Sequence, residues 1–279
     1  DESESRGLGD VYKRQEMNSK LHITSGPILD KGSDLAGILT SLQEGDILFI
    51  DEIHRMPRVV EEYLYSAMED FRLDIMVESG ANAKSISLPI KPFTLVGATT
   101  KSGSLSSPLR DRFGLQFRLS HYSEEELSQI ILRSADILDI PLEKPAAGLL
   151  SSRSRGTPRI ANRILKRCRD MAQVRANGII TKEVSLKTLK MLGIDDDGLD
   201  EMDRKILLCL MEKFNGGPVG LSTIGTAIAE EKDTLEEVYE PYLIQKGFIK
   251  RTPRGRMATH KAYKKLDRPM PTGSQEELF

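Results

Sequence analysis

Residues 45–55 read GDILFIDEIHR, and this stretch decides the fold class. Ile47 to Ile50 is a short apolar run, which predicts a strand buried within a parallel sheet. Asp51 and Glu52 follow at the carboxyl end of that strand, where open α/β sheets usually bind their ligands. In phosphate-transfer ATPases an acid at this place helps to hold magnesium, and its neighbour can orient the attacking water. Taken alone, the stretch favours a simple strand end over a phosphate site, and the rest of the chain has to decide.

Composition excludes several classes of protein. The 279 residues carry a formal net charge of −2, so total charge does not point to nucleic acid. The two cysteines, Cys168 and Cys209, lie far apart inside helical patterns, which favours reduced, buried thiols over a disulfide framework. No apolar run reaches membrane-spanning length and no signal peptide is recognisable, so we expect a soluble, cytoplasmic protein without a membrane partner.

Patterns of apolar residues predict alternating strands and helices as far as residue 122. Helical spacing of apolar residues precedes and follows the opening strand, and a period of two then predicts a β-hairpin over 72–88. The elements predicted here are strands 21–24, 47–50, 93–97 and 115–119, helices 34–42 and 57–71, and the hairpin.

The remaining chain is predicted to be mainly helical. Ser123 and Glu126 form a capping box, and Thr157-Pro158 suits the start of a helix. An acidic linker near 195–203 separates these helices from a final segment in which three helices precede a two-stranded ribbon, the order of a winged-helix module. The predicted elements are helices 123–138, 157–174, 181–192, 202–214, 222–229 and 234–246, and strands 248–251 and 256–259.

Four polar motifs follow one another in the order of an AAA+ ATPase. An acidic strand end at Asp51-Glu52 precedes a polar strand end at Thr99-Thr100, and the arginine-bearing turn 107–113 precedes RGTPR at 155–159. The segments GDILFIDEIHR, AMEDFRLDI, FTLVGATT, LSSPLRDRFG and RGTPRIANR closely resemble the RuvB family, the Holliday-junction branch-migration motors of bacteria. The resemblance extends from about Glu16 to Arg268.

The resemblance implies a domain organisation and an activity. It implies an α/β AAA+ core with an incomplete parallel sheet over 16–122, a helical lid over 123–194 and a winged-helix DNA-binding head over 195–268. Residues 1–15 match nothing in the family and are expected to be unrelated residues joined to it, and 269–279 are expected to be a disordered tail. The implied activity is ATP-dependent DNA translocation that drives branch migration in recombination and repair.

The same resemblance assigns roles in a nucleotide site for ATP and Mg²⁺. Asp51 would hold magnesium, mostly through water, and Glu52 would activate the attacking water. Thr100, beside Thr99, would approach the γ-phosphate, and Arg112 would be an arginine finger that reaches the nucleotide of a neighbouring subunit. The residues implied to line the nucleotide are Glu69, Asp70, Phe71, Arg112, Tyr122 and Arg159. Composition alone would place Phe71 and Tyr122 in a core and pair Arg112 with Asp111.

Partners are implied in the same way. The hairpin 72–88 resembles the family's docking element for RuvA, with Ile86 and Leu88 as its apolar contacts, although both residues could equally complete the core. Arg251 and Arg256 flank the wing turn and are implied to contact the duplex arms of a Holliday junction. RuvC in the resolving complex and a homo-hexameric ring are the other implied partners.

One family motif is missing from the sequence. No G-x-x-x-x-G-K-[ST] occurs, and Gly7-Leu8-Gly9 is not followed by Lys-Thr. We therefore expect this polypeptide to bind ATP weakly and to hydrolyse little of it. An alternative function is a non-enzymatic DNA-binding regulator whose winged helix acts while the ATPase remnant is a scaffold. A DEAH-type helicase is disfavoured because a small helical domain stands where a second recombinase-like domain would be required.

Overall fold

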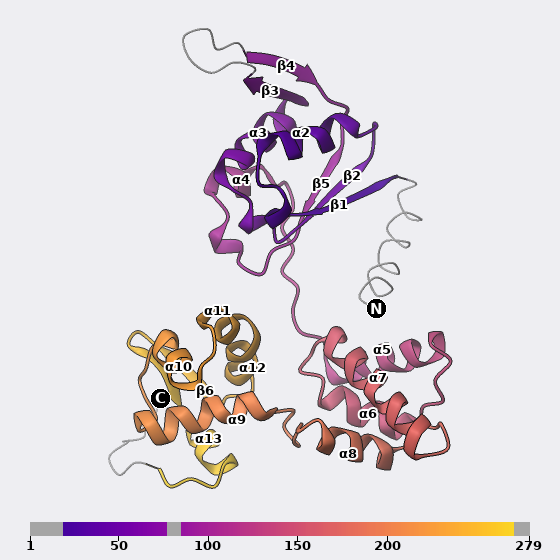
Figure 1. Cartoon of the computed structure of the whole chain (residues 1–279), viewed down its shortest axis with the longest axis vertical. Coiled ribbons are helices and arrows are strands. Elements are labelled where there is room, and N and C mark those ends of the chain that lie inside the picture. The colour runs from indigo at the N-terminus through magenta and orange to yellow at the C-terminus, as the bar shows by residue number, and fades with distance from the viewer. Residues whose placement is uncertain (1–18, 77–84, 271–279) are drawn as a thin grey trace. The chain divides into compact units, whose positions relative to one another are not determined.

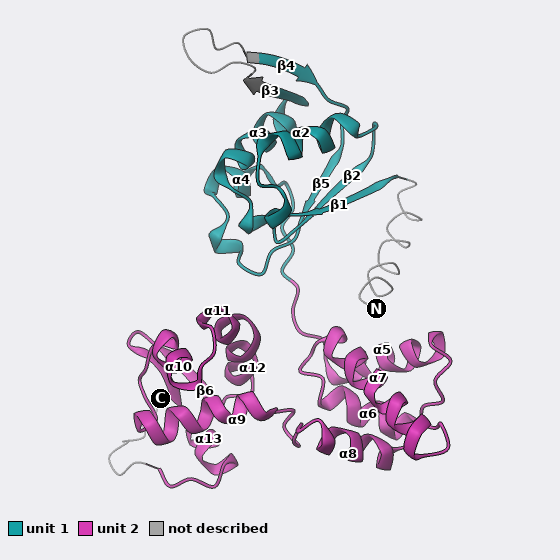
Figure 2. Ribbon diagram, viewed as in Figure 1, with its two compact units in different colours: residues 1–118 teal, residues 119–279 magenta. Residues whose placement is uncertain are grey.

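The computed structural model describes residues 19–76 and 85–270, which form parts of two compact units, 1–118 and 119–279 (Figure 2). The leader 1–15, the hairpin tip and residues 271–279 of the tail lie outside the described residues.

The first unit contains a three-stranded parallel sheet, shown in Figure 1. Its order is β1 (Leu21–Ser25), β2 (Ile47–Asp51) and β5 (Thr94–Gly97), with Ile50 paired to both Thr24 and Gly97. The predicted central strand is confirmed, because Leu48 and Ile50 are fully buried. Helices α2 (Gly32–Ser41) and α3 (Arg58–Glu69) pack their apolar sides into the same core.

The prediction of a second buried strand at 93–97 is wrong about burial. β5 forms as expected, but Thr94, Val96 and Gly97 are exposed. Among the described residues β5 pairs with β2 alone, so its other edge and much of its surface face solvent. Position at an edge, rather than residue type, decides the burial of a strand.

The prediction of a strand at 115–119 is also wrong. No strand forms there, and Leu115, Phe117 and Leu119 are 75%, 82% and 94% exposed. Alternating apolar residues suit a strand, but its backbone groups need a partner, and no described segment pairs with this one. A short helix that the pattern did not predict, α4 (Ser107–Arg112), lies just before it, capped by the hydroxyl of Ser106.

The predicted hairpin is present as the antiparallel pair β3 (Arg72–Met76) and β4 (Ser85–Pro89). Leu73 is fully buried, whereas Ile86 and Leu88 are 47% and 36% exposed. Of the two alternatives for Ile86 and Leu88, burial in the core is therefore excluded. Single-turn 3₁₀ helices at Gly26–Ile28, Ile53–Arg55 and Ser102–Ser104 complete this unit.

The second unit begins with a bundle of four helices (Figure 1). They are α5 (Glu124–Ile137), α6 (Lys144–Ser152), α7 (Pro158–Arg175) and α8 (Lys182–Met191). The capping box of Ser123 and Glu126 is confirmed, whereas α6 was not predicted. Pro158 occupies the first turn of α7 as expected, but the hydroxyl of Thr157 donates to the Arg155 carbonyl instead of capping the helix.

A winged-helix module follows, as predicted. Its helices are α9 (Glu201–Leu208), continued by a π-helical turn at Cys209–Lys213, then α10 (Leu221–Ile228), α11 (Lys232–Thr234), a second π-helical turn at Leu235–Tyr239 and α12 (Glu240–Gln245). The wing is β6 (Ile249–Thr252) and β7 (Gly255–Ala258), and α13 (His260–Lys265) follows without having been predicted. Cys168 and Cys209 are buried free thiols, as expected.

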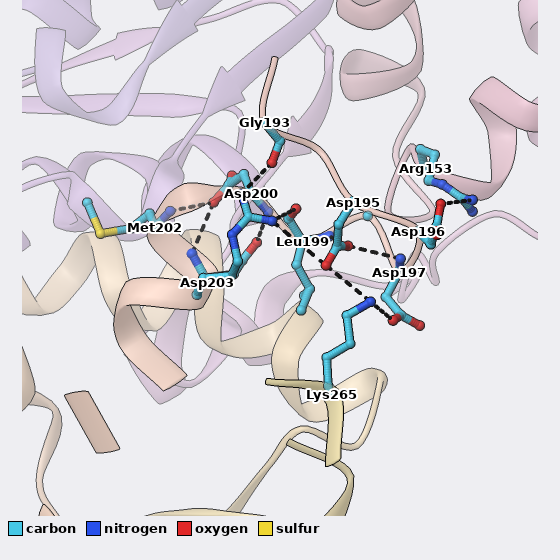
Figure 3. A network of polar contacts seen from close by, with 12 residues as sticks. Arg153, Gly193, Asp195, Asp196, Asp197, Leu199, Asp200, Met202, Asp203 and Lys265 are labelled. Carbon is cyan, nitrogen blue, oxygen red and sulfur yellow. Dashed lines mark hydrogen bonds and ion pairs between the residues drawn. The ribbon is translucent and has the colours of Figure 1, made fainter. Parts of the chain in front are cut away.

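The acidic segment 195–203 is not a loose linker but part of a polar network that joins the helix bundle to the winged helix (Figure 3). Asp200 caps α9 by accepting from the amides of Met202 and Asp203. Lys265 pairs with Asp195 and Asp197, and Arg153 of the bundle pairs with Asp196 at 3.2 Å.

Arg155 makes the central connection of this network. Its guanidinium pairs with Asp200 at 2.9 Å and with the fully buried Asp203, donates to the Gly198 carbonyl and lies 4.9 Å from the ring centre of Tyr242. Four contacts from one buried cation therefore fix the bundle to the winged helix. No helix among the described residues is long and apolar enough to cross a membrane.

Candidate nucleotide and DNA sites

The polar ends of β2 and β5 meet at one edge of the sheet. The two strands are parallel neighbours, and the Ala98 amide donates to the Ile50 carbonyl (2.9 Å) while the Ile53 amide donates to the Ala98 carbonyl (3.0 Å). These bonds hold the residues after each strand side by side. The structure thus brings Asp51 and Glu52 next to Thr99 and Thr100, as the sequence motifs predict.

Glu52 is held by residues from both strand ends. Its backbone is left-handed, with φ of 47°, which turns the chain sharply after β2. Thr100 donates its hydroxyl to a Glu52 carboxylate oxygen at 3.3 Å, and His54 Nδ1 lies 3.1 Å from the same oxygen. His54 Nδ1 is also 2.8 Å from the Thr99 hydroxyl. The carboxylate is therefore positioned by two neighbours, Thr100 and His54, and His54 is itself held by Thr99.

Sequence reasoning missed His54. Its side chain is only 9% exposed and connects Glu52 with Thr99, so it sets the position of the acid that the motif singles out. A histidine two residues after an acid carries no recognisable signal by itself. The turn formed by Ile53–Arg55 is what directs it back toward β5.

Asp51 offers a suitable contact for a hydrated magnesium ion. It is exposed, and one carboxylate oxygen accepts from the Glu52 amide at 3.1 Å. Magnesium in nucleotide sites is commonly bound by one or two carboxylates together with waters and substrate phosphates. The described residues contain no cluster of three or more acids, histidines or cysteines that would form an all-protein metal cage. This donor set fits Mg²⁺ that arrives with a nucleotide.

Arg112 faces α3 of its own unit. Its guanidinium lies 3.0 Å from Glu69, donates to the Pro108 carbonyl at 2.8 Å and stacks 4.4 Å from the ring centre of Tyr65. Pairing with Asp111 is therefore not what holds it. Among the described residues its Nε atom is buried without a hydrogen-bond partner.

A buried acid fixes the helix that carries Arg112. Glu61 in α3 accepts from the Ser106 hydroxyl at 2.5 Å and from the Tyr65 hydroxyl at 3.3 Å. Ser106 is also the cap of α4, so α3 determines where α4 begins and, six residues later, where Arg112 stands. The helical spacing of α3 gave no signal for this contact, because Glu61 reads as an ordinary exposed acid.

The other residues expected near a nucleotide are divided between the two units. Asp70 pairs with Arg72 at 3.1 Å, and Phe71 is 39% exposed with its ring edge-on to Phe93. In the second unit the Tyr122 amide donates to the Gly156 carbonyl at 3.0 Å, just before the first turn of α7, which carries Arg159. Tyr122 and Arg159 are both exposed, so Tyr122 does not pack in a core.

Gly156 permits this close approach. Its φ is 69°, and a Cβ there would lie 2.6 Å from the Cβ of His121. We expect Gly156→Ala to destabilise the second unit by about 1–3 kcal/mol, because alanine disfavours positive φ and His121 cannot easily move. Thermal or urea unfolding measures the loss. Gly178→Ala, with φ of 83° but open space around it, separates the backbone cost from the clash, and equal losses in the two variants would exclude the clash.

Both arginines of the wing are bound to one acid. Arg251 and Arg256 form a cross-strand pair, and each donates two hydrogen bonds to the carboxylate of Glu240 at 2.8–3.2 Å. The side chain of Arg251 is 57% exposed, whereas that of Arg256 is 18% exposed. The two residues predicted to contact DNA are therefore not equivalent.

An acidic strand end beside a polar strand end, an arginine-bearing helix, a helical domain and a winged helix together define an AAA+ ATPase with a DNA-binding module. Three family models match in the same order: the Holliday junction DNA helicase RuvB P-loop domain over 8–119, the RuvB AAA lid domain over 122–195 and the RuvB C-terminal winged helix domain over 196–267.

Relatives agree with the models. The Holliday junction branch migration complex subunit RuvB of Prosthecochloris aestuarii is 60% identical over 264 residues, which cover 95% of this chain and 77% of that protein. The protein of the same name from Myxococcus xanthus is 57% identical over the same shares. The solved structure titled Thermotoga maritima RuvB Holliday junction branch migration motor has a TM-score of 0.82 at 52% identity, covering 92% of this chain and 82% of that one. The chain belongs to the RuvB family.

Proposed function

We propose that this chain is a subunit of an ATP-driven motor that moves the duplex arms of a Holliday junction. The observation that carries the proposal is the Glu52 carboxylate, which Thr100 and His54 hold at the carboxyl ends of β2 and β5 beside Asp51. Phosphoryl transfer depends mainly on positioning and on charge, and an oriented Glu52 carboxylate beside the Asp51 carboxylate supports such a role. Membership of the RuvB family is what suggests that ATP hydrolysis is coupled to movement of Holliday-junction DNA.

Each residue of the cluster then has a task. Asp51 would hold Mg²⁺ through water, and the ion would neutralise charge on the nucleotide phosphates. Glu52 accepts a proton from the attacking water, and Thr100 both orients Glu52 and presents a hydroxyl toward the γ-phosphate. Arg112 acts on the nucleotide of the next subunit in a ring, for which a hexamer is the proposed assembly. The proposed nucleotide contacts are Glu69, Asp70, Phe71, Tyr122 and Arg159.

The same proposal assigns the interaction surfaces. The exposed Ile86 and Leu88 on the hairpin are the proposed contacts for RuvA, and the wing is the proposed contact for duplex DNA. Assembly with RuvC is proposed from the branch-migration role alone.

We further propose that the 279-residue polypeptide hydrolyses ATP very slowly, because no Walker A signature occurs in its sequence. That motif supplies the backbone cradle and the lysine for the β- and γ-phosphates. This absence also favours the second candidate function, a DNA-binding regulator in which the ATPase fold is a scaffold. In either case the wing binds DNA.

One experiment separates the candidates. We expect DNA-stimulated ATP turnover of this chain to equal the background of a Glu52→Gln variant. A chain in which a family P-loop segment precedes residue 16 will hydrolyse ATP and migrate four-way junctions, because the proposal assigns the remaining parts of the nucleotide site to this chain. Robust turnover by the unmodified chain would contradict the proposed deficiency. Failure of the extended chain, once shown to be folded, to act on junctions would contradict the motor proposal.

A further inference from the structure

A buried carboxylate lies beneath the wing of the winged-helix module. Glu240, the first residue of α12, is 2% exposed and accepts hydrogen bonds from the guanidinium groups of both Arg251 and Arg256. Each arginine presents two nitrogens to its two oxygens, which is the geometry in which Arg–carboxylate contacts are strongest and most directional. One acid thus fixes two cations from neighbouring strands.

The charges of this cluster account for the arrangement. Arg251 and Arg256 stand opposite each other across β6 and β7, so their charges would repel without an anion between them. Burial pushes the pKa of Glu240 upward, but hydrogen bonds from Arg256 and Arg251 outweigh it and hold that pKa below its usual value. The carboxylate therefore stays ionised at neutral pH, and the cluster retains a net charge of about +1.

The two arginines differ in what remains available for a ligand. Arg256 exchanges both backbone hydrogen bonds with Val219, and its side chain is only 18% exposed. Arg251 is 57% exposed, and Glu240 engages only its Nε and one terminal nitrogen. A guanidinium has five N–H donors, so the outer side of Arg251 keeps donors for a second oxygen anion.

We propose that Glu240 is a positioning residue for DNA binding, which it serves through Arg251. Glu240, which the half-buried Arg256 also binds, fixes Arg251 on the face of the wing, with its free donors directed to a backbone phosphate. Arg254 in the wing turn is exposed and, within the described residues, has no ion pair, so it adds a second phosphate contact. Arg256 then supports the wing rather than touching DNA. This inference rests on the proposed function, in that it takes duplex DNA as the ligand of the wing.

Substitution of Glu240 separates positioning from net charge. Glu240→Gln makes the cluster more positive, so charge alone predicts tighter DNA binding and a steeper salt dependence. The positioning role predicts weaker binding, about 3- to 10-fold. In the unmodified chain Glu240 holds Arg251 in place before DNA binds, whereas in the variant Arg251 loses conformational freedom only on binding. It also predicts that the slope of log affinity against log salt becomes shallower by about one phosphate contact. Fluorescence anisotropy of the full chain with a labelled duplex measures both quantities.

Further variants keep the test decisive. Glu231→Gln removes an exposed acid of the same module and should leave affinity unchanged or slightly improved. Arg251→Gln should weaken binding as much as Glu240→Gln does, and the double variant should lose no more than either single one. If Glu240→Gln does not fold, as judged by thermal unfolding, Glu240→Asp takes its place. It keeps the charge but withdraws the carboxylate by one methylene, and it should still weaken binding.

The outcomes distinguish this inference from the proposed function. Normal or tighter binding by a folded Glu240 variant, with Arg251→Gln weakened, overturns the positioning role alone. Additive losses in the double variant overturn it as well, because Glu240 would then not act through Arg251. If Arg251→Gln, Arg254→Gln and the Glu240 variants all bind DNA as the unmodified chain does, the wing is not the DNA surface, and the proposed function fails with it.

Discussion

Replacing Arg155 by methionine will destabilise the second unit by about 3–5 kcal/mol at pH 8, the usual cost of removing one partner from a buried ion pair. Asp203 is fully buried, and its carboxylate would lose the guanidinium that compensates its charge. Methionine retains much of the arginine's apolar length, so packing against Tyr242 is largely kept. The loss of unfolding free energy therefore measures the missing charge rather than a change in side-chain volume.

The cost will depend on pH. Burial raises the pKa of Asp203 from 3.8 to about 7, although the Arg155 charge opposes the rise. Because this folded-state pKa lies above that of the unfolded chain, the folded protein keeps a proton between about pH 4 and 7 that the unfolded chain has released. Stability from this group is therefore complete below pH 4 and is lost as the pH rises toward 7. At pH 5 the protonated Asp203 needs no partner, and Arg155→Met will cost less than at pH 8.

Arg153 supplies the matched control. It lies on the same loop and pairs with Asp196, but that acid is 92% exposed. Arg153→Met should cost no more than about 1 kcal/mol at either pH, as is usual for surface ion pairs. Urea unfolding at pH 5 and pH 8 gives all four values. A pH-independent loss in Arg155→Met, or a loss no larger than that of Arg153→Met, would show that the Arg155 network does not hold the two domains together.

Motif order predicted the family and the three folded modules because those signals are local. An apolar run that ends in two acids, a Thr-Pro helix start and a three-helix-plus-ribbon order can each be recognised in a few consecutive residues. The burial of Leu48 and Ile50 and the meeting of Glu52 with Thr100 followed from such signals, whereas the exposure of Ile86 and Leu88 was one of two open alternatives.

What the sequence did not reveal depends on contacts between distant residues. Glu61, Arg155 and Glu240 read as ordinary charged residues of helices or loops, yet each is largely buried and holds groups 10 to 50 residues away. The segment 115–119 shows the converse error, because its alternation is suited to a strand but no described segment supplies a neighbour. Local sequence patterns specify which helices and strands can form, and contacts with distant segments of the chain decide which of them do form.

The largest expected effect on activity belongs to Arg112. In a chain extended by a family P-loop segment, Arg112→Ala should lower the rate of ATP hydrolysis by about 10³-fold or more, the usual contribution of an arginine finger. The structure shows Arg112 bound to Glu69 and Tyr65, with one buried donor unused. A residue that only stabilised α3 against α4 would lower the melting temperature and leave the rate per folded subunit unchanged. Steady-state turnover and thermal unfolding, measured on the same samples, separate the two roles.

Mixing two inactive variants tests whether Arg112 acts on a neighbouring subunit. Glu52→Gln subunits keep Arg112 but lack the base, whereas Arg112→Ala subunits keep the base but lack the finger. If the finger works in trans, a mixed ring contains sites with Glu52 from one subunit and Arg112 from the next, so the mixture should recover turnover that neither variant has alone. Arg110→Ala is the matched control, because Arg110 lies on the same helix and contacts only Ser107 among the described side chains, and its rate should change less than about 3-fold. No recovery in the mixture, with rings shown to form, would place the action of Arg112 within its own subunit, where its contacts with Glu69 and Tyr65 already lie.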